Sequence, residues 1–121
     1  MSPAGQDLDN DLVTIITPTR DRSHMLQALY SCICSQDWIN LEWFVEDDSS
    51  APSLFMESLD DSRVTYTHLQ ATKSIGEKRN SMLKRAKGRY IIHFDDDDFY
   101  APQYAWSTLP SHLLPFPWLG L

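Results

Sequence analysis

Short runs of β-branched and aromatic residues alternate along this chain with longer segments in which apolar residues recur every three or four positions. The short runs are typical of buried strands, and the longer segments are typical of helices with one apolar face. The predicted strands are residues 13–17, 41–45, 64–69 and 90–94, and the predicted helices are residues 23–36, 52–59 and 77–87. Strands that alternate with helices indicate an α/β fold with a mostly parallel sheet and flanking helices.

Residues with special backbone properties mark where the predicted elements begin and end. Pro18 closes the first strand, because proline has no N–H to donate to a sheet. Ser23 is a suitable N-cap for the first helix, and Pro52 suits the first turn of the second. Gly76 precedes the third helix, and Gly88 is placed as the C′ residue that ends it. The helix boundaries therefore rest on these residues as well as on the hydrophobic pattern.

Polar residues follow three of the four predicted strands directly. These segments are residues 18–21 (PTRD), residues 47–50 (DDSS) and residues 95–98 (DDDD). In open parallel sheets, ligands bind outside the carboxyl ends of the strands. Polar groups without a role in a site would be scattered over both ends of the sheet. The sequence therefore predicts a binding site at the carboxyl edge.

The composition is that of a single domain. The chain has 121 residues, of which 42% are hydrophobic, and this suffices for one core. No run approaches the roughly 18–20 apolar residues that a membrane span needs. We divide the chain into an acidic N-terminal extension (residues 1–11), an α/β domain (residues 12–104) and an irregular apolar tail (residues 105–121) that contains three prolines.

The N-terminus and the cysteines favour a cytoplasmic location. The first residues have neither the basic nor the apolar region of a secretory signal. Cys32 and Cys34 lie one residue apart in a predicted helix, where a direct disulfide would be strained. We therefore expect two reduced thiols in a cytoplasmic protein.

Charge is unevenly distributed along the chain. The net charge of −7 argues against binding to nucleic acid or to anionic membranes. However, seven of the ten basic residues lie between Lys73 and Arg89, and the aspartate run 95–98 follows the next predicted strand. A basic helix beside an acidic cluster can hold a metal ion and a phosphorylated ligand together. The alternative is a solvated helix face followed by a polar turn.

Three motifs together resemble the donor-binding half of family-2 glycosyltransferases, which have the GT-A (Rossmann-like) fold. They are VTIITPTRDR, WFVEDDSS and SIGEKRNSMLKRAKGRYIIHFDDDDFY, and each includes the end of a predicted strand. The resemblance covers residues 12–102. It implies inverting transfer of a sugar from a nucleoside diphosphate, with a UDP-sugar as the favoured donor and Mn²⁺ or Mg²⁺ as cofactor. The acceptor is unknown.

The resemblance assigns donor-binding roles to the first two polar segments. Pro18, Thr19, Arg20 and Asp21 match the segment that lines the nucleotide, and Thr19 is expected to contact the base. Asp47 matches the position that accepts a hydrogen bond from the base, whereas Asp48 is expected to order the loop. The alternative for this acidic pair is a local Asx-type turn that caps the next helix.

The resemblance also covers the G…RN segment of the basic helix. Gly76, Arg79 and Asn80 match it, and the guanidinium of Arg79 can fork onto a phosphate or a ribose. We expect Lys73 and Lys78 to be surface lysines.

The aspartate run overlays the D-x-D signature of the family. Four adjacent carboxylates repel one another, and a divalent cation relieves that repulsion. We assign Asp97 as the direct metal ligand, with Asp95 contacting the ribose or a metal-bound water and Asp98 as a second ligand. Asp96 belongs to the donor-binding segment, with its side chain pointing away. The alternative is a non-catalytic cation site or a solvated turn.

An inverting transfer also needs a general base, and in the family this base lies well downstream of D-x-D. Residues 105–121 contain no Asp or Glu and no longer resemble the family. We therefore expect a sheet truncated after its fourth strand, no catalytic base and possible self-association through an uncovered edge. One alternative function is a non-catalytic sugar-nucleotide-binding fragment. A sugar nucleotidyltransferase is disfavoured, because residues 18–22 lack the glycine-rich loop of that class.

Overall fold

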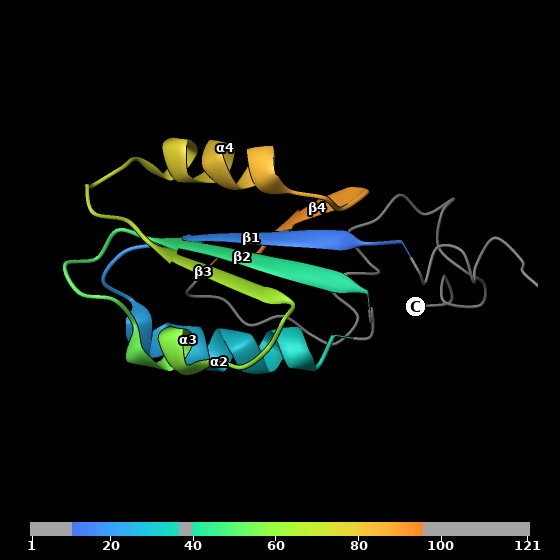
Figure 1. Ribbon diagram of the computed structural model, residues 1–121, viewed down its shortest axis with the longest axis horizontal. Helices are drawn as coiled ribbons and strands as arrows, with labels where there is room; N and C mark the ends of the chain where they lie inside the picture. The colour runs from blue at the N-terminus through green and yellow to red at the C-terminus, as the bar shows by residue number, and fades with distance from the viewer. Residues whose placement is uncertain (1–10, 37–39, 96–121) are drawn as a thin grey trace, which may run out of the picture.

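The computed structural model describes residues 11–36 and 40–95, which form four strands and three helices (Figure 1). The α/β class and the alternation of strands and helices are confirmed. The elements are β1 (Val13–Thr19), α2 (Ser23–Cys34), β2 (Leu41–Asp47), α3 (Leu54–Ser58), β3 (Val64–His68), α4 (Ile75–Arg85) and β4 (Tyr90–His93). None of the described helices is both long enough and apolar enough to cross a membrane.

The four strands form one sheet in the order β3-β2-β1-β4, and every pairing is parallel. The chain adds β2 and β3 on one side of β1 and then returns to place β4 on the other side. This reversal of direction creates a crevice outside the carboxyl ends of β1 and β4, where ligands of such sheets bind. The predicted convergence of the polar strand ends at one edge of the sheet is therefore observed for the described residues, which include Asp95 but not residues 96–98.

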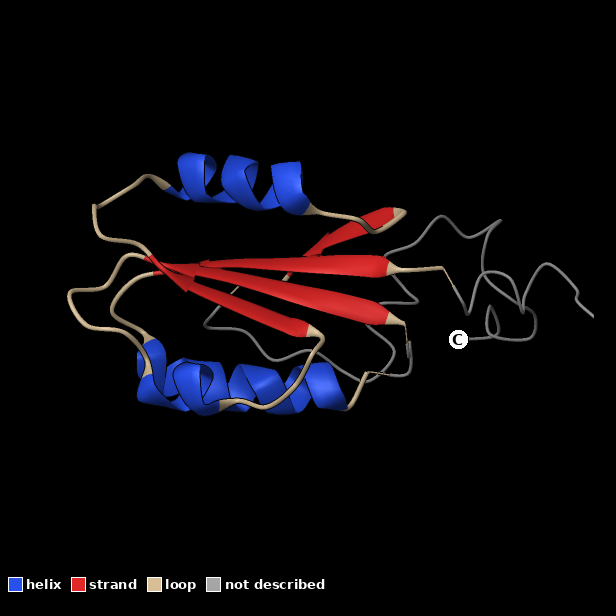
Figure 2. Cartoon of the chain, viewed as in Figure 1, coloured by secondary structure: helices blue, strands red, loops and turns tan. Residues whose placement is uncertain are grey.

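Helices cover both faces of the sheet, with α2 and α3 on one face and α4 on the other (Figure 2). The α2/α3 face is closed by a large apolar cluster, because alternate residues of every strand point into it. Its buried members are Val13, Ile15, Leu26, Leu29, Ile33, Leu41, Trp43, Val45, Met56, Ile92 and Phe94. This cluster is the main core of the domain.

The α4 face has a smaller apolar core and several buried polar contacts. Its apolar cluster consists of Ile16, Phe44 and Met82, with Ala86 packed against them. Next to it, the buried Glu46 accepts hydrogen bonds from Ser81 (2.6 Å) and Arg85 (2.7 Å) through one carboxylate oxygen. Helix α4 is therefore held to the sheet by charge as well as by packing.

Two proline predictions are wrong. Pro18 lies inside β1, which continues to Thr19. The structure tolerates it because, within the described residues, β1 pairs with β4 only as far as Ile16, so one side of Pro18 needs no ladder hydrogen bond. Pro52 precedes α3 instead of occupying its first turn, and the N-cap is Ser53, whose side chain accepts from the Met56 N–H.

The predicted ends of α2 and α4 also need correction. Ser23 is the first residue of α2, and its N-cap is Arg22, which makes no side-chain capping bond. Gly76 is the second residue of α4, because the capping box of Ser74 and Glu77 starts the helix at Ile75. Helix α4 ends at Arg85, before Gly88.

Gly88 has a packing role that the sequence did not reveal. A Cβ at this position would overlap the Thr14 side chain and lie 2.5 Å from the Thr14 backbone nitrogen. The Gly88 N–H donates to Thr14 Oγ1 at 2.8 Å. Glycine is therefore needed here for the close approach of the chain to β1, with φ in the ordinary range.

The predicted extension and tail, residues 1–11 and 105–121, fall outside the described residues apart from Asp11. The boundary of the domain at residue 104 and the proposed self-association also lie outside them and stay predictions. Within the described residues, β3 and β4 are the two edge strands of the sheet.

Candidate functional site

The carboxyl ends of β1 and β4 and the start of α4 surround a cavity of about 580 Å³. We call it the basic cavity, because five of its ten lining residues are basic and one is acidic. The lining residues are Pro18, Thr19, Arg20, Arg22, Lys73, Ser74, Ile75, Lys78, Arg79 and Asp95. The cavity occupies the crevice that the strand order predicts. In a chain of net charge −7, such a lining is suited to an anionic ligand.

A second cavity, of about 350 Å³, is lined by both members of the ion pair of Arg20 and Asp48. We call it the polar cavity. It is lined by Arg20, Asp21, Asp48, Ser49, Ser50, His68, Leu69, Gln70 and Thr72. Arg20 lines both cavities, so the position of its side chain affects both.

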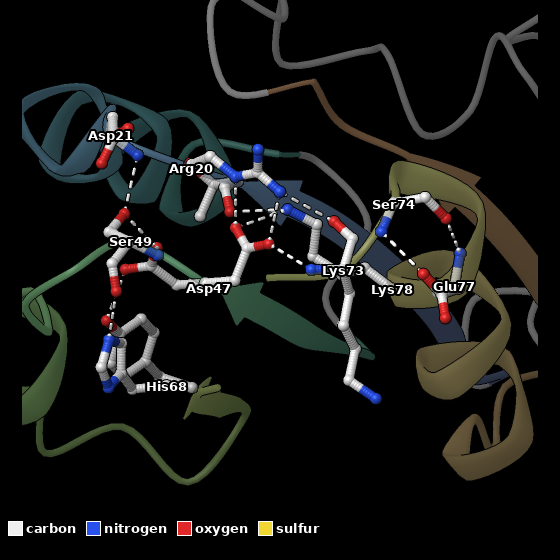
Figure 3. A network of polar contacts seen from close by, with 12 residues as sticks. Arg20, Asp21, Asp47, Ser49, His68, Lys73, Ser74, Glu77 and Lys78 are labelled. Carbon is white, nitrogen blue, oxygen red and sulfur yellow. Dashed lines mark hydrogen bonds and ion pairs between the residues drawn. The ribbon is translucent and has the colours of Figure 1, made fainter. Parts of the chain in front are cut away.

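Asp48 is the centre of the contacts that hold this region together, and its partners Arg20, Lys73 and Lys78 are labelled in Figure 3. Its side chain has no exposed surface, and it accepts from Arg20 Nε (3.0 Å) and Nη2 (2.7 Å), the Lys73 N–H (2.7 Å) and Lys78 Nζ (2.9 Å). The hydrogen bonds from Arg20, followed by those from Lys73 and Lys78, hold the pKa of Asp48 well below its usual range. Asp48 therefore orders the loops, as predicted.

Lys78 is buried, so its prediction as a surface lysine is wrong. Only 3% of its side chain is exposed, and Nζ donates to the Thr19 carbonyl (3.0 Å) and to Asp48. A usable signal was present in the sequence: Lys78 precedes the buried Met82 by one helical turn and therefore shares its face. The side chain of Lys73 is exposed, as predicted.

Arg20 combines a fixed position with access to solvent. Its guanidinium forks onto both oxygens of Asp48 and also donates to the Lys73 carbonyl at 3.0 Å, yet 45% of the side chain is exposed. The hydrogen bonds to Asp48 raise the pKa of Arg20 further. The side chain therefore presents a permanent positive charge to the basic cavity.

Asp47 is engaged in a separate, buried network. Oδ1 accepts from the Ser49 N–H (2.9 Å) and the Ser49 hydroxyl, and Oδ2 accepts from the Tyr66 hydroxyl (2.7 Å). Burial, and then the bond to Asp47, raise the pKa of Tyr66. The contact with the Ser49 N–H is the Asx-type turn given as the alternative for this pair, although Ser53 caps α3. The contact of Asp47 with a base stays a prediction.

Asp21 adopts a backbone conformation that most residues avoid. Its φ is +56°, in the left-handed region that aspartate tolerates better than most side chains. The Asp21 N–H donates to the Ser49 hydroxyl at 2.7 Å, which joins the end of β1 to the end of β2. Asp21 lines the polar cavity, whereas its neighbours Arg20 and Arg22 line the basic cavity.

Of the described donor-binding residues predicted on α4 and just after β4, two line the basic cavity and two do not. Arg79 and Asp95 line it, with Arg79 Nη2 3.5 Å from Asp95 Oδ1. Within the described residues, the buried Nε of Arg79 has no hydrogen-bond partner. Gly76 and Asn80 are exposed but do not line the cavity.

The start of α4 adds to the positive potential of the basic cavity. Ser74 and Ile75 line the cavity, and the macrodipole of α4 places partial positive charge at this end. The capping box uses the Ser74 hydroxyl for the Glu77 N–H (3.0 Å) and the Glu77 carboxylate for the Ser74 N–H (2.9 Å). The latter bond lowers the pKa of Glu77. The box therefore keeps this end of the helix ordered.

The metal site predicted from the aspartate run is only partly described. Asp96, Asp97 and Asp98 lie outside the described residues. Asp95 is 53% exposed at the rim of the basic cavity, and a carboxylate is a suitable ligand for Mg²⁺ or Mn²⁺. Among residues 11–36 and 40–95, no three His, Cys, Asp or Glu side chains are grouped to hold a metal. The metal ligands therefore stay predictions.

His68 was not considered from the sequence, although it ends β3 at the same edge of the sheet. Its Nε2 lies 2.7 Å from the Ser49 carbonyl. Because a carbonyl only accepts, Nε2 must carry a proton there. His68 therefore ties β3 to the loop after β2 and lines the polar cavity.

A comparison with protein families matches residues 14–110 to the model of glycosyl transferase family 2. Two curated relatives are each 34% identical to the chain. One is a UDP-Glc:alpha-D-GlcNAc-diphosphoundecaprenol beta-1,3-glucosyltransferase of Escherichia coli, matched over 77% of this chain and 38% of its own length. The other is a GalNAc(5)-diNAcBac-PP-undecaprenol beta-1,3-glucosyltransferase of Campylobacter jejuni, matched over 71% of this chain and 29% of its own. The chain thus spans well under half of these relatives.

Solved structures share the fold. Residues 1–349 of TarS from S. aureus, in complex with UDP-GlcNAc, superpose with a TM-score of 0.71 at 24% identity, over 78% of this chain and 29% of that one. A mannosyltransferase from Pyrobaculum calidifontis, in complex with GDP-Man and Mn²⁺, superposes with a TM-score of 0.64 at 23% identity, over 73% and 28%. At this level of identity, the likeness concerns the fold.

Proposed function

This chain belongs to glycosyl transferase family 2 and has a GT-A-like fold, and from that premise we propose that its basic cavity binds the diphosphate of a nucleoside-diphosphate sugar for inverting glycosyl transfer. A UDP-sugar is the first candidate for the donor, with Mn²⁺ or Mg²⁺ as the cofactor. The E. coli relative is named for UDP-Glc, and TarS is in complex with UDP-GlcNAc, which supports uracil as the base. The mannosyltransferase complex holds GDP-Man, so guanine is the second candidate.

The observation that carries this proposal is the charge of the basic cavity. Five basic residues line it in a protein whose net charge is −7. A diphosphate supplies the opposite charge, and guanidinium groups bind phosphate oxygens with charge-assisted, paired hydrogen bonds. Arg79 lines the cavity, and its buried Nε has no hydrogen-bond partner among residues 11–36 and 40–95, so this donor supports the proposal.

In the proposed complex, two arginines stabilise the leaving group. Arg79 and the exposed part of Arg20 bind the diphosphate, which gains negative charge as the bond to the sugar breaks. A divalent ion held by Asp95, Asp97 and Asp98 would supply Lewis-acid neutralisation of the same charge when bound. Thr19 and the Asp47 segment contact the base. We assign no general base within the described residues.

Titration of UDP into the purified chain tests the proposal directly. With Mn²⁺, we expect binding that weakens when EDTA removes the metal. Arg79→Gln should weaken it by about tenfold or more, because a charge-assisted bond is worth about 1.5–3 kcal/mol. The matched control is Arg89→Gln, since Arg89 is exposed and pairs with Asp11 away from the cavity.

The outcomes separate the parts of the proposal. Binding of GDP in place of UDP would correct the base and keep the site. A folded chain that binds no nucleoside diphosphate would overturn the donor-site assignment. Transfer of labelled sugar to an added acceptor separates a transferase from the alternative of a non-catalytic binding fragment.

A further inference from the structure

Two cations share one buried carboxylate at the wall of the basic cavity. Arg20 and Lys78 both bond to Asp48, whose side chain has no exposed surface. The two cations differ in access: 45% of the Arg20 side chain is exposed, against 3% of the Lys78 side chain. The carboxylate therefore has one partner that is open to solvent at the cavity and one that is buried.

This arrangement affects what Arg20 can do. A buried carboxylate that loses its only cation is strongly destabilised, because no water replaces the lost partner. If Arg20 were the only cation on Asp48, its movement toward a phosphate would carry that penalty. Lys78 Nζ and the Lys73 N–H also bond to Asp48, at 2.9 Å and 2.7 Å, so the carboxylate would keep two donors if Arg20 moved. The penalty is thereby reduced.

Lys78 is well placed for such a resident role. Its ammonium group also donates to the Thr19 carbonyl at 3.0 Å, so it is anchored to the end of β1 as well as to Asp48. Its backbone belongs to α4, which packs on β1 and β2. Lys78 therefore connects the helix, the end of β1 and the loop after β2 from inside the wall of the cavity (Figure 3).

We propose that Lys78 is a positioning residue: it is the permanent counter-ion of Asp48 and thereby allows Arg20 to turn from Asp48 to the diphosphate of the ligand. This inference rests on the proposed function, since it requires an anionic group in the basic cavity. It assigns Lys78 an effect on affinity that acts through Asp48 and Arg20, without contact between Lys78 and the ligand.

A cycle of variants tests the inference by titration of UDP and of pyrophosphate. In Lys78→Met, Arg20 becomes the only side-chain cation on Asp48 and should be retained there, so both ligands should bind about tenfold more weakly. In Lys78→Met with Asp48→Asn, no buried anion remains to retain Arg20, and affinity should return to within about threefold of the wild type. Lys84→Met, at an exposed position of the same helix, is the control and should bind like the wild type.

The folded state of each variant is checked by circular dichroism before titration, so a loss of affinity is not a loss of folded protein. If Lys78→Met alone does not fold, the comparison of Asp48→Asn with Asp48→Asn/Lys78→Met remains. Equal affinities in that pair support the inference. A further tenfold loss on removing Lys78 overturns it, because Lys78 then acts independently of Asp48.

Other outcomes distinguish this inference from the proposed function. Wild-type affinity in a folded Lys78→Met variant overturns the role of Lys78 and leaves the donor site intact. Failure of the double variant to recover also overturns it. A wild-type chain that binds neither UDP nor pyrophosphate overturns the proposed function and this inference together.

Discussion

The two faces of the sheet are built differently. The face under α2 and α3 is closed by a large apolar cluster, whereas the face under α4 combines three buried apolar residues with buried charged groups. The apolar face supplies most of the hydrophobic stabilisation, since this scales with buried apolar area. The α4 face holds Glu46 and Lys78, and its helix borders the basic cavity. The α2/α3 face therefore supplies most of the stability, and the α4 face carries the charged groups beside the cavity.

The division has a physical reason. Charged side chains near a ligand are useful only where the surrounding structure holds them in place, and each buried charge requires partners. On the α4 face, Glu46 is paired with Arg85, and Lys78 with Asp48. A face made of such pairs gives less net stabilisation than an apolar one. The apolar face opposite makes this arrangement tolerable.

The largest expected effect is on the apolar face. Trp43→Ala should lower the free energy of unfolding by about 3–5 kcal/mol, because a large cavity forms in the main core. The Trp43 indole N–H also donates to the Thr17 hydroxyl at 2.9 Å, and that bond is lost. Urea unfolding followed by circular dichroism measures the change. Leu54→Ala, at a residue 80% exposed, is the control and should change stability little.

Met82→Ala makes the corresponding test on the α4 face. Met82 is fully buried between α4 and the sheet, but its cluster is small, so we expect a loss of about 2–3 kcal/mol by urea unfolding. Leu29→Ala on the opposite face gives a comparison of similar size. If Met82→Ala proves more costly than both Leu29→Ala and Trp43→Ala, the assignment of stability to the apolar face is wrong.

Acid should weaken the network around Asp48. In the folded state the pKa of Asp48 lies below its ordinary value of 3.8. The contribution of Asp48 to the free energy of unfolding is therefore present above about pH 4 and is lost as the pH falls toward the folded-state pKa. Below about pH 4 the unfolded chain binds a proton at this position that the folded chain does not. Stability measured by urea unfolding from pH 6 to pH 3 should therefore fall more steeply for the wild type than for Asp48→Asn. Parallel curves would show that Asp48 contributes nothing to acid sensitivity.

The smallest expected effect concerns the start of α4. Ser74→Ala removes the capping bond to the Glu77 N–H and should lower the free energy of unfolding by about 1 kcal/mol. Ser74 also lines the basic cavity, so UDP binding should weaken. The effect should be slight, because the Ser74 hydroxyl is already bonded to the Glu77 N–H. Thermal unfolding and titration measure the two effects. A large loss of affinity with unchanged stability would show that Ser74 itself contacts the ligand.

Much of the candidate site could be predicted from local sequence. Strands and helices follow from short-range periodicity, and parallel strands bring their carboxyl ends to one edge, which places Thr19, Arg20 and Asp95 around one cavity. The loop-ordering role of Asp48 was also expected, from the resemblance of the segment after the second strand to the family. The role of Gly88 could not be predicted, because its close neighbour Thr14 is remote in sequence.

The sequence by itself determined the α/β class, the positions of the strands and helices to within a few residues, and the motifs that connect the chain to its family. Only the tertiary structure decided that Arg20 and Lys78 share the carboxylate of Asp48. The physical reason is that periodicity and propensity depend on neighbours along the chain. The partner of a buried charge is set by the packing of distant segments, here α4 against the ends of β1 and β2.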